Sequence, residues 1–150
     1  MPESLKIVTY PDPFLRRRVD DVDEVDDGVR RAVSDMLHTM YEKHGVGLAA
    51  SQVGVNRRIL AINPTGDPDD ELVLINPMIA EARGAMEGEE GCLSFPGVSG
   101  LVIRSCNITV AGYDLDGNEV EIVACDFLAR VLQHEIDHLE GMLFVDRMTP

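Results

Sequence analysis

The most informative segment of the sequence is Gln133-His134-Glu135-Ile136-Asp137-His138-Leu139. If it forms a helix, His134 and His138 lie four residues apart on one face and can hold one metal ion between them. Glu135 follows His134 directly, close enough to act as a general base on water at that metal without being a ligand. This H-E-x-x-H pattern predicts a metal site on a helix, which the rest of the chain is expected to complete.

The residues around this stretch predict a largely buried helix. Asp126 is placed as its N-cap and Gly141 as the glycine just beyond its C-terminal end. Apolar or metal-facing residues cover more than half of its circumference. They are Phe127, Leu128, Val131, Leu132, His134, Ile136, His138 and Leu139. Burying two histidines and a glutamate without partners is costly, and a metal relieves that cost. Because paired histidines can also be ordinary core or surface residues, the motif alone leaves a helix without metal open.

The composition indicates one acidic globular domain. The chain has 150 residues, 45% of them hydrophobic, which is enough for a single domain with a real core. Its formal net charge is -14, a surface that repels phosphate backbones and anionic membranes and so argues against direct nucleic-acid or membrane binding. Three cysteines and no N-terminal targeting segment predict a cytosolic protein without a disulfide framework.

Hydrophobic periodicity predicts two helices and mostly antiparallel strands. Apolar residues recur at helical spacing from Val29 to Tyr41, which predicts an N-terminal amphipathic helix with Asp27 near its start. Strands are expected at residues 58–63, 72–76, 78–85, 108–114 and 119–124. Asp116-Gly117 joins the last two strands as a hairpin. Because strands and helices do not alternate, we expect an α+β fold with mostly antiparallel β-sheets packed around the central histidine-bearing helix.

Three other stretches are expected to lack regular structure. Residues 84–91 are acidic and glycine-rich and are expected to be irregular, and residues 142–145 form a short extended tail. Gly45–Gln52 is rich in small residues and by itself indicates a tight turn against the core. A phosphate loop is excluded there, because no Gly-Lys-Ser/Thr follows.

A catalytic metal usually takes three protein ligands, so a third ligand must be found. Only 12 residues follow His138, and Phe144 stands where an extended form of the motif has its third histidine, so the ligand must lie upstream. The candidates are Cys92, Cys106, Cys125, His38 and His44. Cys106 and Cys125 lie in or beside expected strands and are interpreted as small core residues. Cys92 lies in a glycine-bounded loop that could deliver a thiolate, and is preferred. Such a site would hold zinc or ferrous iron.

Three stretches together resemble the signature motifs of the peptide deformylase family: Gly45–Gln52 (GVGLAASQ), Glu90–Ser94 (EGCLS) and Gln133–His138 (QHEIDH). They occur in the family's order, and the likeness extends from Tyr10 to Asp146. The family consists of metal-dependent hydrolases that act in protein biosynthesis. They remove the formyl group from the N-terminal formyl-methionine of newly made polypeptides and release formate.

The resemblance implies roles for matching residues. Cys92, His134 and His138 would bind the metal, which would be ferrous iron in the cell and zinc, nickel or cobalt in some preparations. Glu135 would be the general acid and base. Gln52 and the backbone N–H of Leu93, the two other positions assigned to catalysis, would face the formyl oxygen.

A methionine pocket is expected beside the metal. Phe127 and Val131 continue the metal-facing line of the helix toward its start. With Val46 and Leu48 they would form an apolar pocket. Substrate-binding positions are also assigned to two glycines, Gly47 and Gly91.

Departures from the family pattern give further expectations. Gly88 stands where a branched apolar residue is frequent, so the cleft rim is expected to be more open. Ser51 replaces a frequent proline or threonine and is expected to change only loop stiffness. The chain ends at Pro150, without the basic C-terminal helix of many bacterial members. We therefore expect one catalytic domain over residues 1–150, a monomer that binds formylated nascent peptides and touches the ribosome only weakly and transiently.

Two alternative functions remain open at this point. An H-E-x-x-H metallopeptidase shares the water chemistry but leaves the motifs at Gly45–Gln52 and Cys92 unexplained. A non-catalytic relative of the family would need neither Glu135 nor Gln52. A purely structural zinc site would require four protein ligands that fill all coordination positions, and no fourth cysteine or histidine is suitably placed.

Overall fold

The computed structural model describes all of residues 1–150, with helix α1 (Asp27–Glu42) near the start of the chain and helix α2 (Asp126–Leu139) near its end. The strands are β1 (Gly47–Ala49), β2 (Ile59–Ile62), β3 (Leu72–Arg83), β4 (Met86–Cys92), β5 (Phe95–Arg104), β6 (Asn107–Tyr113) and β7 (Glu119–Cys125). They form a five-stranded sheet in the order β1-β2-β3-β6-β7 and a separate β4–β5 hairpin, with every pair antiparallel. The predicted α+β fold with antiparallel sheets and two helices is confirmed.

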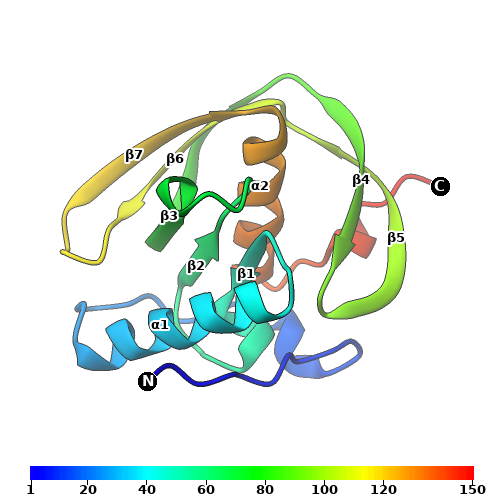
Figure 1. Cartoon of the computed structure of the whole chain (residues 1–150). Helices are drawn as coiled ribbons and strands as arrows, with labels where there is room; N and C mark the ends of the chain where they lie inside the picture. Colours follow the sequence, from blue (N-terminus) through cyan, green and yellow to red (C-terminus); the bar gives the residue numbers. More distant parts are fainter.

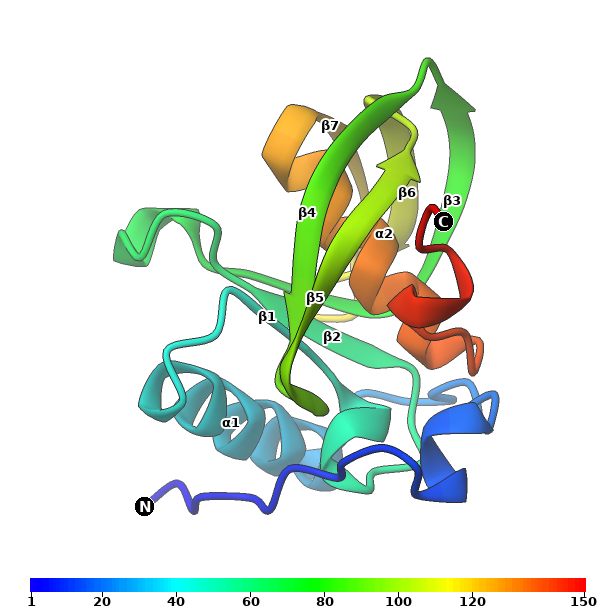
Figure 2. The same cartoon turned by 90° about the vertical axis from the view of Figure 1, so that its right-hand side faces the viewer.

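Helix α2 lies between the five-stranded sheet and the β4–β5 hairpin (Figures 1 and 2). Its apolar side chains, among them Leu132, Ile136 and Leu139, pack with residues of the sheet in the largest core cluster. Of its 14 residues, 10 are buried, so the helix is the central element of the fold. Helix α1 packs against the sheet at the β1–β2 end, where Met36 and Met40 enter a second cluster.

The ends of α2 are fixed by contacts with other parts of the chain. Asp126 is the first helical residue and Cys125 the N-cap, so the predicted cap is one position too late. The backbone N–H of Asp126 donates to the carbonyl of Cys106 at 3.0 Å, which ties the helix start to the residue just before strand β6. At the other end Gly141 adopts φ +80°, and a Cβ there would lie 2.3 Å from the carbonyl oxygen of Arg16. Only glycine fits this turn.

The two strands predicted at residues 72–76 and 78–85 are one bent strand, β3. Its first half pairs with β2 and its second half with β6, with a register shift between Ile75 and Met78. The bend contains Asn76 at φ +51° and Pro77, which has no N–H to give to the sheet. Asn76 also holds the preceding loop, because its side chain exchanges two hydrogen bonds of 2.8 Å with the backbone of Val22.

The prediction that residues 84–91 are irregular is wrong, because most of them form strand β4. Cys92 ends that strand and pairs with Phe95, so Leu93 and Ser94 make the hairpin turn. Acidic residues and glycines disfavour a strand by propensity, but pairing along the whole of β5 overrides that preference.

Two smaller expectations also differ from the structure. Instead of an extended tail, the chain after α2 contains a 3-10 helix, η4 (Phe144–Asp146), and Phe144 is fully buried. Cys106 is half-buried and Cys125 exposed, so neither is a core residue. Neither α-helix combines the length and the apolar character that a membrane crossing requires.

Candidate metal and peptide site

Cys92, His134 and His138 come together where the end of β4 meets α2. One donor atom from each lies within 4.8 Å of the others, and Cys92 Sγ is 3.3 Å from His138 Nε2. The helical spacing puts the two imidazole rings 5.0 Å apart, and the β4–β5 turn supplies the sulfur. A thiolate and two imidazoles suit zinc or ferrous iron.

The surroundings of His138 fit a metal ligand. Its Nδ1 is buried without a hydrogen-bond partner. Burial and the positive charges of His134 and Arg104 hold the pKa of His138 well below its ordinary value. A lowered pKa favours the neutral ring, which is the form that can coordinate a cation.

His134 is oriented by Glu90 and Phe144. Its Nδ1 donates to Glu90 Oε1 at 2.9 Å, which leaves Nε2 as the ring nitrogen for a ligand. The Phe144 ring stacks against it with 5.9 Å between centroids. Burial opposes protonation of His134, but the charges of Glu135 and Cys92 and the hydrogen bond to Glu90 raise its pKa to about 10. The same negative surroundings favour a metal cation.

Glu90 is a buried acid that the sequence analysis did not identify. Burial alone would raise its pKa, but hydrogen bonds from Arg104 and His134 outweigh burial and hold the pKa well below its usual range. Arg104 donates to both carboxylate oxygens at 2.9 Å, and Arg130 donates to Oε2 at 2.6 Å. A signal for this cluster existed: Arg130 lies on a helix predicted to be buried, and a buried arginine needs an acidic partner.

Glu135 is buried beside strand β1 and has one carboxylate oxygen, Oε1, without a hydrogen-bond partner. Gly47 makes this approach possible, because a Cβ on it would lie 2.5 Å from Glu135 Oε2. Burial, helped by the charge of Glu90, raises the pKa of Glu135 to about 7 against the opposing effects of His134 and Arg104. A carboxyl with such a pKa can accept and return a proton near neutral pH.

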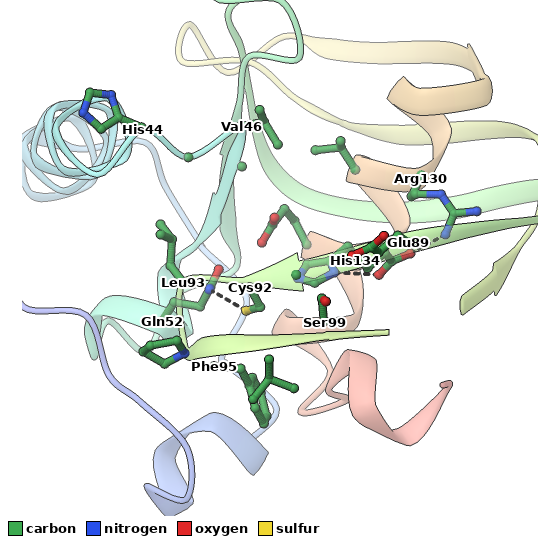
Figure 3. A pocket seen from close by; sticks show the side chains of 18 of the residues that line it. His44, Val46, Gln52, Glu89, Cys92, Leu93, Phe95, Ser99, Arg130 and His134 are labelled. Atoms are coloured by element: carbon green, nitrogen blue, oxygen red, sulfur yellow. Dashed lines mark hydrogen bonds and ion pairs between the residues drawn. The ribbon is translucent and has the colours of Figure 1, made fainter. Parts of the chain in front are cut away.

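The Gln52 side chain is fixed next to the cysteine. Its Oε1 accepts from the backbone N–H of Ala49 at 2.9 Å, and its Nε2 lies 3.4 Å from Cys92 Sγ and 3.3 Å from Ser94 Oγ. Figure 3 shows this amide joined to the Cys92 sulfur by a dashed line. The neighbouring Ser51 does more than set loop stiffness, since its hydroxyl donates to the His138 carbonyl at 3.2 Å.

A cavity of about 710 Å³ opens beside these groups and suits a small peptide. Its wall includes most of the residues assigned to catalysis, metal and substrate, together with Arg130, which was not assigned. Those assigned residues are Val46, Gly47, Gln52, Gly91, Cys92, Leu93, Phe127, Val131, His134 and Glu135 (partly labelled in Figure 3). Phe127 is 52% exposed and Val131 only 5%, which places Phe127 nearer the mouth.

Leu48 corrects the expected pocket. It does not line the cavity but is fully buried in the cluster formed with α1. Side chains alternate along a strand, and Gly47 and Ala49 face α2 in β1. Leu48 therefore points to the opposite side of the sheet.

Comparison with known proteins adds four findings. The polypeptide deformylase family model matches residues 4–150. The peptide deformylase of Thermomicrobium roseum is 52% identical over 148 residues, which cover 95% of this chain and 84% of that protein. The crystal structure of peptide deformylase from Thermotoga maritima superposes with a TM-score of 0.94 at 38% identity and covers 99% of both chains. A Met-Ala-Ser-bound peptide deformylase from Acinetobacter baumannii has a TM-score of 0.93 at 33% identity, covering 99% of this chain and 100% of that one.

Proposed function

The chain belongs to the polypeptide deformylase family, and we propose that Cys92, His134 and His138 hold the metal with which it removes N-terminal formyl groups. The observation that carries this assignment is the clustering of the three donors beside a cavity that Cys92, His134, Glu135 and Gln52 line, with His138 behind its wall. In this proposal residues 1–150 form one catalytic domain. The native ion is ferrous iron, and zinc, nickel or cobalt can replace it in the same donor set.

The reaction adds water to the formyl carbon and breaks its bond to the methionine nitrogen. When bound, the metal supplies Lewis acidity that activates water and polarises the formyl group. Glu135 takes one proton from the water and gives it to the departing amine, so that formate and a free N-terminus result. The Gln52 amide and the Leu93 backbone N–H donate to the formyl oxygen as it gains negative charge.

Replacing Gln52 with leucine is expected to lower kcat by about 10²–10³, the usual effect of losing one oxyanion donor. KM should change little, because the bond strengthens as charge develops on the oxygen. Steady-state kinetics of formate release would measure both constants, and metal analysis of the same preparation would check that the neighbouring Cys92 still holds its ion. A variant with an unchanged kcat would remove Gln52 from this role.

In the proposed pocket, Val131 contacts the methionine side chain. Val131→Asp is expected to raise KM for formyl-methionyl peptides by about 10- to 100-fold, because burying an aliphatic side chain contributes about 1.5–3 kcal/mol. Metal content should stay near that of the unmodified protein. Val123→Asp is the matched control, since Val123 is 78% exposed on β7 and remote from the cavity. Equal KM values for the two variants would exclude Val131 from the pocket.

The substrate in this proposal is a formylated nascent peptide, which a cytosolic enzyme can reach. The Met-Ala-Ser ligand of the Acinetobacter baumannii relative supports a cavity for peptides that begin with methionine. A reducing compartment also keeps the Cys92 thiol available as a ligand. With a net charge of -14, any contact with ribosomal RNA is weak and transient in this proposal. The proposal takes the working form to be a monomer.

The proposal is tested against the metallopeptidase alternative by two matched peptides. Formyl-Met-Ala-Ser should yield formate and intact Met-Ala-Ser, whereas unformylated Met-Ala-Ser should remain uncut. Mass spectrometry of the products distinguishes the two reactions in one experiment. Cleavage of a peptide bond in either substrate would favour the metallopeptidase alternative.

A further inference from the structure

Arg130 is held in place by three acceptors in the β4–β5 hairpin. Its Nη1 donates to Glu90 Oε2 at 2.6 Å and to the Val102 carbonyl at 3.0 Å, and its Nη2 donates to the Met86 carbonyl at 3.0 Å. The side chain is only 7% exposed. It reaches across from α2, one turn before His134, as Figure 3 shows. The planar guanidinium therefore joins the helix to both strands of the hairpin.

Gly88 leaves the space that this guanidinium fills. Gly88 lies in β4 opposite Val102, and a Cβ on it would stand 2.9 Å from Arg130 Cζ and Nη2 and 3.0 Å from Nε. These atoms are buried and hydrogen-bonded, so they cannot move aside as the free end of a surface side chain would. The more open cleft rim expected from Gly88 is thus not found at this point, because Arg130 occupies it and forms part of the cavity wall.

Glu90 connects Arg130 to His134, one of the three residues proposed to bind the metal. Its carboxylate is 4% exposed and uses Oε1 for His134 Nδ1 and Oε2 for Arg130, while Arg104 bridges both oxygens. Arg104 also donates a hydrogen bond from Nη1 to Asp137 Oδ2 at 2.5 Å. Oε2 thus accepts from both arginines, and Arg130 is the one that also donates to the hairpin carbonyls of Val102 and Met86. It therefore helps to set the direction in which Oε1 faces His134.

We propose that Arg130 is a positioning residue that aligns His134 through Glu90, and that Gly88 is required because any side chain there would displace Arg130. This inference rests on the assignment of His134 as a metal ligand under the proposed function. Partners behind a ligand orient its ring, and their loss typically weakens metal binding by about 10- to 100-fold. Gly88 and Arg130 would therefore affect metal affinity jointly, because both determine where the guanidinium lies.

The test uses cobalt(II) loaded at one equivalent into Arg130→Met, Gly88→Val and the double variant. Both single variants are expected to release cobalt to a chelator about 10-fold faster than the unmodified protein and to show a shifted visible d–d spectrum. The double variant should resemble Arg130→Met alone, because Gly88→Val has no guanidinium left to displace. Arg31→Met, on the exposed side of α1, is the matched control and should release cobalt at the unmodified rate.

Two milder variants cover the case in which a substitution prevents folding. Gly88→Ala adds only the clashing Cβ. Arg130→Lys keeps the positive charge but loses the planar guanidinium that donates to three acceptors. Both variants should therefore release cobalt faster than Arg31→Met. Cobalt release and spectra identical to those of the unmodified protein, with only a lower Tm, would overturn the positioning role. If Cys92→Ala also bound cobalt like the unmodified protein, the ligand assignment itself would fail, and the inference with it.

Discussion

Glu135→Gln is expected to lower kcat for formate release by about 10²–10⁴ while the protein keeps its metal. Glutamine preserves the shape of the side chain beside Gly47, where a Cβ would already lie 2.5 Å from Oε2, but it cannot take up the proton of the attacking water. KM should change far less than kcat, because the carboxylate acts on the water and the departing amine. Formate release and metal analysis on one preparation would measure both effects.

The matched control for this prediction is Glu121→Gln, an identical substitution at an exposed position on β7. It should leave kcat unchanged. Fast formate release by Glu135→Gln with full metal content would mean that another group handles the proton. Glu90 could not easily do so, because Arg104, Arg130 and His134 surround its carboxylate.

Removal of the metal is expected to abolish the reaction and to destabilise the fold. Losing Lewis acidity worth several kcal/mol reduces the rate by at least about 10²–10³. A metal held at 100 times its Kd also stabilises the native state by about 2.7 kcal/mol, so the chelated protein should unfold at a lower temperature. Calorimetry and formate assays before and after chelation would measure the two effects.

Adding back one equivalent of ferrous iron without oxygen should restore both activity and Tm. Cys92→Ala should respond poorly to the same addition, whereas Cys106→Ala should recover fully, because Cys106 lies outside the metal group. A chelated protein that retained its activity and Tm would contradict the assigned role of the metal.

The central part of the site could be predicted because its signals are local. Helical spacing alone places His134 and His138 together, and Gly141 ends the helix where the sequence predicts. Cys92, which the sequence favours as the third ligand, lies in the group of possible metal-binding residues. The glycine-bounded loop expected around Cys92 is in fact the end of strand β4 followed by a hairpin turn.

The surroundings of the site could not be predicted because they depend on contacts that are distant in sequence. Residues 84–91 look like an exposed acidic loop, yet β4 exists because β5 pairs with it and Glu90 is buried under two arginines. The pocket assignment of Leu48 failed for a similar reason. Which face of β1 turns toward α2 depends on how the sheet packs, and the sequence around Leu48 does not record it.

The measurement that most directly tests the account is a titration of metal-free protein with ferrous iron under anaerobic conditions. Formate release from a formyl-methionyl peptide would be followed throughout. We expect activity to rise linearly and level off at one iron per chain, with Cys92→Ala remaining inactive. Full iron binding without formate release, or equal activity in Cys92→Ala, would contradict the claim that Cys92, His134 and His138 hold the metal for deformylation.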